Sequence, residues 1–429
     1  MKKRTISAVL LVALLLSCIG FAGGKLMASA AQSRFVLKDE VTMSEKEAEL
    51  RQTVVDRMNA MATYIWEPKS TMRYTCYGND GCANFYVSGE KAMGIPYNHN
   101  GGSLNRLKYC LDENGVVQDW VPTIGNDLYD VYIGADCSTA LYKAWAAVCT
   151  SLGDNFPRTR FQCPWAGEGS LPVGGYGWKS NSTATTHYPK DEITGMGYTA
   201  QDLYGFYAQM KMGDGVITMN SSGGHTRMAT TNPVVYWDPD TGEIDGEQSY
   251  MLFTQCGGVS RHYEYVTDEN GNEEAYVCYW GINGKYTFKQ LFNSSYLPFT
   301  CNELNDPDTY YEEAWVEIEE DLEAPSKYAL CVGNVKSNYA IDFVTIRVES
   351  EHGEAWEAVQ FPALDGNASY GYTDPMRAPY KELDLAYFEV ALRQLHLRAG
   401  MTYHCSVLVT LMNDEEISVK EFDITMPAV

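Results

Sequence analysis

The stretch Ala135-Asp136-Cys137-Ser138-Thr139-Ala140-Leu141-Tyr142-Lys143-Ala144-Trp145 places a cysteine where a helix is predicted to begin. Asp136 suits the N-cap position, and the helix is predicted to run to Leu152, with Gly153 closing it. This prediction rests on apolar residues at helical spacing, namely Ala140, Leu141, Ala144, Trp145 and Val148. Because unpaired amides and the dipole at a helix start favour a thiolate and can hold an oxyanion, Cys137 is the candidate nucleophile.

A cysteine nucleophile also needs a base and a polar group that orients this base. Of the seven histidines, His225 follows a Gly-Gly pair at the start of a predicted strand, and His262 follows the turn after Cys256. Spacing alone leaves both open as the base. Gln255, at the end of another predicted strand, is the candidate for the orienting group.

The N-terminal residues predict export. Lys2, Lys3 and Arg4 precede an apolar run that ends near Ile19, and small residues follow up to Ala31. This order predicts a secretory signal peptide over residues 1–31 and a secreted or cell-surface protein. Contact with a membrane is expected only through an uncleaved signal or, less favourably, through a lipid anchor at Cys18.

Composition narrows the partners. The formal net charge is −24, which argues against nucleic acid because phosphate binding needs clustered Lys and Arg. Twelve cysteines include Cys18, so an odd number remain after signal cleavage, and at least one thiol is expected to stay unpaired. Export favours disulfides among the others. No CxxC pair occurs, and we expect neither a metal nor another cofactor. The oligomeric state is left open.

The rest of the chain divides into segments of different character. Ser44-Glu45-Lys46-Glu47 predicts a capping box and a helix to about Tyr64. Residues 154–198 predict a long insertion without regular periodicity, and residues 199–212 another short helix. Residues 215–299 predict strands joined by turns. Residues 302–326 are acidic and predict a linker, so the unit before the linker spans residues 32–301.

Residues 327–429 predict a β-sandwich. Four segments have the composition of strands, and Leu397 to Cys405 resembles the tyrosine corner of immunoglobulin-like and fibronectin type III modules, with Tyr403 as the tyrosine. Cys331 and Cys405 are the only cysteines after the predicted linker, and we expect a disulfide between them.

Four motifs in order resemble the NlpC family of papain-like cell-wall peptidases over about residues 90–256. They are Met93-Gly94-Ile95-Pro96-Tyr97, Ala135-Asp136-Cys137-Ser138, Gly213-Asp214-Gly215-Val216-Ile217 and Gly224-His225. The resemblance implies an α+β fold, with a papain-like domain whose nucleophile helix packs on an antiparallel sheet, followed by the β-sandwich. It departs from the family at Thr139, where a glycine is usual.

The resemblance also assigns roles. It makes Cys137 the nucleophile and His225 the base, with Gln255 as the best candidate for the orienting residue. It places three further residues on the substrate or oxyanion side, namely Tyr97, Asp136 and Ser138. The implied function is a secreted, bacterial cysteine peptidase or amidase that hydrolyses peptidoglycan stem peptides. Two alternatives stay open: another acyl transfer, such as transpeptidation, and a non-catalytic adhesion or binding protein.

Overall fold

The structure is a computed structural model. It describes residues 34–76, 79–97, 103–118, 123–124, 127–128, 134–152, 169–176, 197–220, 223–268, 270–320, 333–360, 381–384 and 397–425. The predicted signal peptide, Cys331 and most of the predicted insertion lie outside these residues. Among the helices of the described part, none is long and apolar enough to cross a bilayer.

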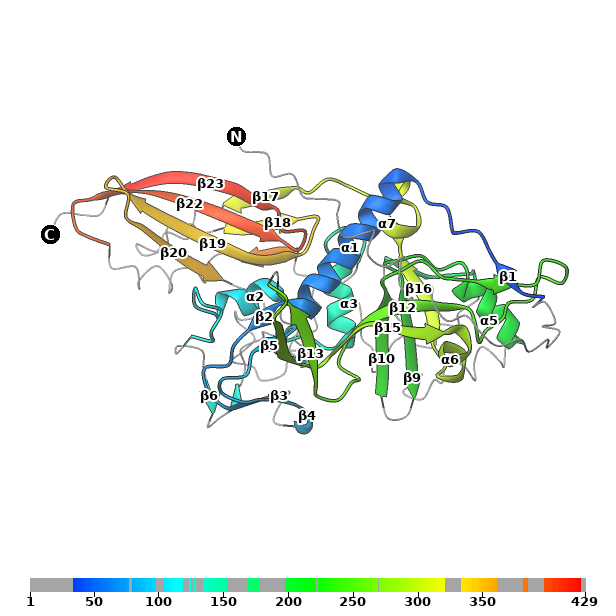
Figure 1. The fold of residues 1–429 in the computed structure, drawn as a ribbon. Helices are drawn as coiled ribbons and strands as arrows, with labels where there is room; N and C mark the ends of the chain where they lie inside the picture. Colours follow the sequence, from blue (N-terminus) through cyan, green and yellow to red (C-terminus); the bar gives the residue numbers. More distant parts are fainter. Residues whose placement is uncertain are drawn as a thin grey trace.

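The fold is mixed α and β, with strands predominating in several sheets (Figure 1). Within the described residues, the helices are α1 (Glu45–Thr63), α2 (Leu104–Tyr109), α3 (Cys137–Trp145), α5 (Ala200–Tyr207), α6 (Phe288–Asn293), α7 (Asn302–Asn305) and α8 (Pro307–Tyr310).

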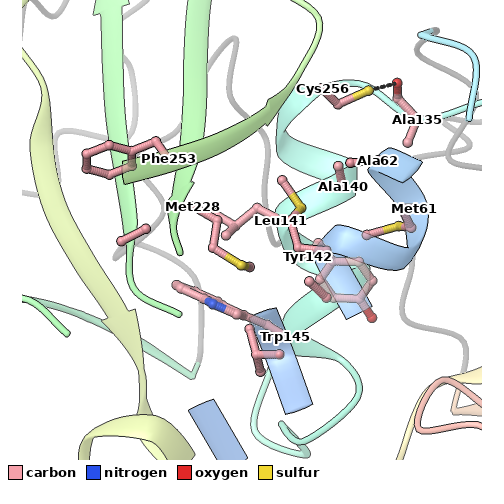
Figure 2. Close-up of a cluster of buried hydrophobic side chains, with 14 of the residues drawn as sticks. Met61, Ala62, Ala135, Ala140, Leu141, Tyr142, Trp145, Met228, Phe253 and Cys256 are labelled. Atoms are coloured by element: carbon pink, nitrogen blue, oxygen red, sulfur yellow. Dashed lines mark hydrogen bonds between the residues drawn. The ribbon is translucent and has the colours of Figure 1, made fainter. Parts of the chain in front are cut away.

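A six-stranded antiparallel sheet forms the centre of the first unit. In spatial order its strands are β15 (Trp280–Thr287), β12 (Tyr250–Cys256), β10 (Gly223–Ala229), β9 (Gly215–Asn220), β16 (Leu297–Cys301) and β8 (Ser170–Pro172). Helix α3 packs on β10 and β12, and α1 packs on α3. All nine residues of α3 are buried, which is expected of a helix covered on every side. Figure 2 shows Leu141 and Trp145 of α3 beside Met228 of the sheet.

Three smaller sheets flank the central one. The first contains β13 (His262–Thr267), β14 (Glu273–Cys278), β5 (Ala92–Met93) and β2 (Ile65–Trp66). The second contains β4 (Asn79–Tyr86), β3 (Met72–Cys76), β7 (Asp127–Leu128) and β6 (Thr123–Ile124). The third pairs β1 (Val36–Leu37) with β11 (Tyr236–Trp237).

Helix α1 begins where the sequence predicts, but its cap differs. The Ser44 hydroxyl accepts a hydrogen bond from the Glu47 amide at 3.1 Å, which is half of the predicted capping box. The Glu47 carboxylate does not return to the Ser44 amide. It is buried and binds Arg51 at 2.8 Å and Lys211 at 2.6 Å instead. The capping-box prediction was therefore wrong for Glu47, because two cations compete for its carboxylate.

Arg51 joins three parts of the chain. The residue is only 2 % exposed. Its guanidinium binds the carboxylates of Asp214 at 2.7 Å and Glu47 at 2.8 Å. It also donates to the carbonyl oxygens of Met212 and Leu304, each at 2.9 Å. These partners belong to α1, to the turn before β9 and to α7. A buried charge needs such paired and hydrogen-bonded surroundings, because water is excluded from it.

The predicted helices after α1 are shorter than expected. Helix α3 ends at Trp145 and continues as turns, and α5 ends at Tyr207 rather than near Met212. The start of α5 has a complete capping box, in which Thr199 and Asp202 exchange hydrogen bonds. Apolar periodicity therefore located these helices, whereas their ends depend on tertiary contacts.

Two antiparallel sheets enclose the C-terminal core. One contains β17 (Val316–Glu320), β18 (Gly333–Ser337) and β21 (Glu382–Asp384). The other contains β20 (Ala355–Gln360), β19 (Ile341–Ser350), β22 (Thr402–Leu411) and β23 (Glu416–Thr425). Val335 and Val407 are fully buried members of this core from the two sheets. The Tyr403 hydroxyl accepts a hydrogen bond from the Arg398 amide at 2.8 Å, as a tyrosine corner requires.

The predicted acidic linker was wrong for residues 302–320. They form α7, α8 and β17, and β17 pairs with β18 in the C-terminal core. The acidic residues obscured this strand, because Glu317, Glu319 and Glu320 alternate with or flank Val316 and Ile318, which pack on that core. The expected Cys331–Cys405 disulfide falls outside the described residues.

One end of the C-terminal unit contacts α1 and α2 (Figure 1). Asn105 of α2 donates to Asp342 at 2.8 Å, and Arg57 of α1 forms an ion pair with Asp414. Lys143 of α3 is buried nearby. Burial lowers the pKa of Lys143 to about 8, with Asp342 raising it and Arg57 lowering it further. Polar contacts therefore join the two units near α3.

We predict that Arg51→Met destabilises the protein by about 3–5 kcal/mol, because Glu47 and Asp214 would stay buried without their cation. Equilibrium unfolding in urea measures this change. Lys289→Ala is the matched control, because Lys289 forms its ion pair with Glu247 on the surface and should leave stability unchanged within error. Equal stability of Arg51→Met and the wild type would contradict the proposed importance of this network.

Candidate active site

Cys137 is the first residue of α3, as predicted. The carboxylate of Asp136, the N-cap residue, accepts hydrogen bonds from the Thr139 amide at 2.6 Å and the Ser138 hydroxyl at 2.8 Å. Ser138 and Asp136 are buried and bind each other, so the structure places both in the cap rather than at an open substrate surface. At the first position of a helix, the amide of Cys137 has no partner within the helix.

The thiol of Cys137 is buried, although it lies at the start of a helix. The residue is 4 % exposed. Burial, followed by the charge of Asp136, raises the pKa of the Cys137 thiol to about 12, although the backbone amides of Thr226 and Ser138 act in the opposite direction. The predicted lowering of this pKa by the helix start was therefore wrong for this state, because burial outweighs the dipole.

His225 and Gln255 are brought together. Nε2 of His225 lies 2.9 Å from Oε1 of Gln255, and Nε of Arg227 also binds this oxygen. Arginine only donates, so the Gln255 atom between them is the carbonyl oxygen. An oxygen of this kind only accepts, and Nε2 of His225 therefore carries the proton. The neutral ring then has its lone pair at Nδ1.

The backbone explains where Gln255 points. The backbone ladder between β10 and β12 contains the pairs Met228–Thr254 and Ala229–Phe253, and it does not extend to His225 or Gln255. On the other side of β12, the register with β15 shifts between Phe253 and Gln255. Asn283, within this irregularity, has φ of 49°. Such bulges re-aim neighbouring side chains and are frequent beside active sites.

Tyr97 and His225 pack on two consecutive glycines. Gly257 and Gly258 have φ of 72° and 71°, a region that other residues rarely adopt. A Cβ atom on Gly257 would lie 2.3 Å from the Tyr97 ring, and one on Gly258 would lie 2.8 Å from the His225 ring. The two glycines therefore hold these rings near the end of β12. Tyr97 also forms a backbone bridge with Ala135, close to Cys137.

Cys137 and His225 have common neighbours. The charge of Asp136 raises the pKa of both groups, and Thr226, whose amide acts on Cys137, follows His225 directly. Among the described residues, the structure records no hydrogen bond between the thiol and the imidazole. The same strand end holds Cys256, whose thiol donates to the Ala135 carbonyl at 3.1 Å (Figure 2).

Arg227 is the site residue that the sequence analysis missed. Its guanidinium lies 3.9 Å from the ring centre of Tyr286 and 4.4 Å from that of Tyr296. Both rings hold it beside Gln255 through cation–π contacts. The signal was available, because residues two apart on a strand share a face, and Arg227 stands two residues after His225.

His262, the other candidate base, lies in the flanking sheet. Its Nε2 is 3.0 Å from Glu264, and its Nδ1 is 3.1 Å from the Ser260 carbonyl oxygen. It lines an open pocket of about 420 Å³ together with Gln255 and Tyr286. His262 therefore faces a space beside the orienting glutamine, whereas its ring nitrogens have partners other than Cys137.

The burial of His225 has a consequence for its protonation. Burial lowers the pKa of His225 to about 4; Arg227 adds to this effect, while the Gln255 hydrogen bond and Asp136 oppose it. At neutral pH both the thiol and the imidazole are therefore uncharged. The ring is able to accept a proton, and both pKa shifts disfavour a thiolate–imidazolium pair.

Lowering the pH should destabilise the folded protein through His225. The unfolded histidine binds a proton below about pH 6.5, whereas the folded one does so only near pH 4. The free energy of unfolding therefore keeps the full contribution of His225 above about pH 6.5, and it falls as the pH is lowered toward 4. We expect the free energy of unfolding to fall further in the wild type than in His225→Asn, by on the order of 2 kcal/mol. This figure allows for the partial exposure of His225. Urea unfolding at each pH measures the difference. Parallel curves would contradict the assignment.

Loss of the Asp136 cap should weaken the start of α3. Asp136→Ala removes the acceptor for Thr139 and Ser138 and should cost about 1–2 kcal/mol in urea unfolding. Asp136→Asn is the matched control, because its amide oxygen keeps the acceptor and removes only the charge. If the alanine and asparagine variants are equally stable, the capping role is refuted.

Comparison of the chain with models of known protein families and with curated proteins finds no match.

Proposed function

We propose that this chain is an exported papain-like cysteine hydrolase that cleaves amide bonds in peptidoglycan stem peptides. In this proposal Cys137 is the nucleophile, His225 the base and Gln255 the orienting residue. The substrate, the bacterial source and the NlpC-like relationship are implied by the ordered sequence motifs, and export is implied by the predicted signal peptide. The chemistry is supported by the arrangement around His225.

The hydrogen bonds of Gln255 carry the proposal. Its carbonyl oxygen accepts from Nε2 of His225 and from Arg227, which leaves Nδ1 of His225 as the basic nitrogen. A base held in one tautomer by a fixed polar group is what thiol activation requires. Arg227 is in turn fixed by Tyr286 and Tyr296, so Gln255 has little freedom to turn.

The mechanism starts from neutral groups. As a substrate carbonyl approaches, Nδ1 of His225 takes the Cys137 proton while the sulfur forms a bond to the carbonyl carbon. The amide of Cys137 stabilises the resulting oxyanion. The carbon–nitrogen bond then breaks as His225 returns the proton to the leaving amine. Water hydrolyses the thioester, which releases the acid and restores the thiol.

The raised pKa of Cys137 favours the non-catalytic alternative, in which the chain is an adhesion or binding protein. A thiol with a pKa of about 12 is protonated at neutral pH and is poorly exposed to reagents. The catalytic proposal therefore requires the site to open or to transfer the proton during attack. Transpeptidation or another acyl transfer uses the same groups and differs only in the acceptor.

Digestion of purified peptidoglycan tests the catalytic proposal. Wild type and Cys137→Ala are incubated with it, and the fragments are read by mass spectrometry. We expect new stem-peptide ends from the wild type alone, because only its sulfur forms the acyl-enzyme. Fragments joined to an added amine would indicate transfer rather than hydrolysis. Identical fragments from both proteins would refute the proposal and favour the binding alternative.

The choice of base has its own test. His225→Ala should lower the rate of fragment release by a factor of at least about 100, because proton transfer is lost. His262→Ala should leave it nearly unchanged, and it is the matched control because His262 lies at the neighbouring pocket. The opposite order of effects would show that the base is misassigned. Circular dichroism of both variants checks that they are folded.

A further inference from the structure

Two buried cysteines meet behind the site. Cys149 lies one turn after α3, where its amide bonds to the Trp145 carbonyl at 2.9 Å, and Cys301 ends β16. Their sulfur atoms are 2.6 Å apart, and both residues are almost completely inaccessible. The structure holds them as free thiols. Neither belongs to the candidate triad.

This separation does not suit two unbonded thiols. Even carbon atoms, which are smaller than sulfur, have their optimal contact at roughly 3.5–4.0 Å. A disulfide bond is about 2.05 Å long. The backbone therefore already brings the two side chains nearer to bonding distance than to ordinary contact, and only a small adjustment of the side chains is needed.

A metal ion fits the same cluster poorly. Glu303 is the third group near the two sulfurs. Its carboxylate already accepts hydrogen bonds from the Thr150 amide at 2.9 Å, the Ser151 amide at 2.7 Å and the Ser151 hydroxyl at 2.9 Å. Two thiolates on a tetrahedral zinc ion would also be about 3.8 Å apart, given Zn–S bonds of about 2.3 Å.

We propose that Cys149 and Cys301 form a disulfide bond in the exported protein. Each thiol loses its proton, and the pair gives up two electrons as the sulfur–sulfur bond forms. The electrons pass to the disulfide of a small-molecule or protein thiol oxidant, through a mixed disulfide that the second cysteine resolves. The oxidant is reduced to two thiols. The proposal does not depend on a catalytic role for Cys137, but it rests on the proposed export.

The cross-link would fasten the nucleophile helix from behind. Cys149 lies one turn after α3, whose first residue is Cys137, and Cys301 ends a strand that pairs with β9 and β8. A bond between residues so far apart in sequence restricts the unfolded chain strongly. It would also hold the segment after α3 against the sheet at the place where Glu303 binds Thr150 and Ser151.

Peptide mapping tests the proposal. The full-length protein is exported to an oxidising compartment, denatured without reductant in N-ethylmaleimide, digested and analysed by mass spectrometry. We expect one linked peptide pair that contains Cys149 and Cys301, two hydrogen atoms lighter than the two thiols, which separates after reduction. Both cysteines alkylated in the unreduced sample would overturn the proposal. Stoichiometric zinc with both cysteines alkylated after chelation would overturn it in favour of a metal site.

Variants give a second measurement. In Cys149→Ala, Cys301 should become available to N-ethylmaleimide after denaturation. The melting temperature of the wild type should fall by on the order of 10 °C in reductant. Cys278→Ala is the matched control, because its buried sulfur contacts the Trp280 backbone, and it should keep the linked pair. If the Cys149 variant does not fold, the wild-type mapping still decides. A melting temperature unaffected by reductant would count against the bond.

Discussion

The buried guanidinium of Arg51 is the constraint on which the first unit depends. It joins α1 to the turn at Asp214 and to the end of α7, so three separate segments meet at one charge. The indole of Trp145 donates to the Gly213 carbonyl at 2.7 Å, which brings α3 to the same turn. Because β9 starts there, the position of the hairpin that carries His225 is linked to both helices.

The candidate site shows how a sheet can present polar groups inside a hydrophobic core. Gln255 stays paired with Gly281 of β15 through its backbone, and its side chain meets polar groups from β10. His225 and Arg227 then occupy its carbonyl oxygen from the neighbouring strand. The same burial that makes these bonds strong also disfavours charge on Cys137 and His225. Burial therefore favours a fixed orientation of His225 and Gln255, but it disfavours the ionisation of Cys137 and His225.

Local patterns predicted the start of α3 and the start of α1, whereas the resemblance to the ordered motifs implied the pairing of His225 with Gln255. Each depends on residues close in sequence or on an ordered set of motifs. The failures involve partners distant in sequence. Glu47 left its capping box because Lys211 approaches its carboxylate. The strand at Val316 was hidden among acidic residues, and its partner strand lies beyond the apparent linker. The pKa of Cys137 depends on burial, which no local pattern reports.

The contact between the C-terminal unit and helices α1 and α2 bears on how separable the two units are. Ala340 and Met412, from the C-terminal unit, belong to the hydrophobic core of the first unit. Met412 also accepts a hydrogen bond from Arg57 at 2.9 Å through its carbonyl. The C-terminal unit therefore contributes to the hydrophobic core of the unit that contains Cys137, and it is not a separable module. Fusing the C-terminal unit to another protein, or replacing it with a different module, would expose apolar surface on both units.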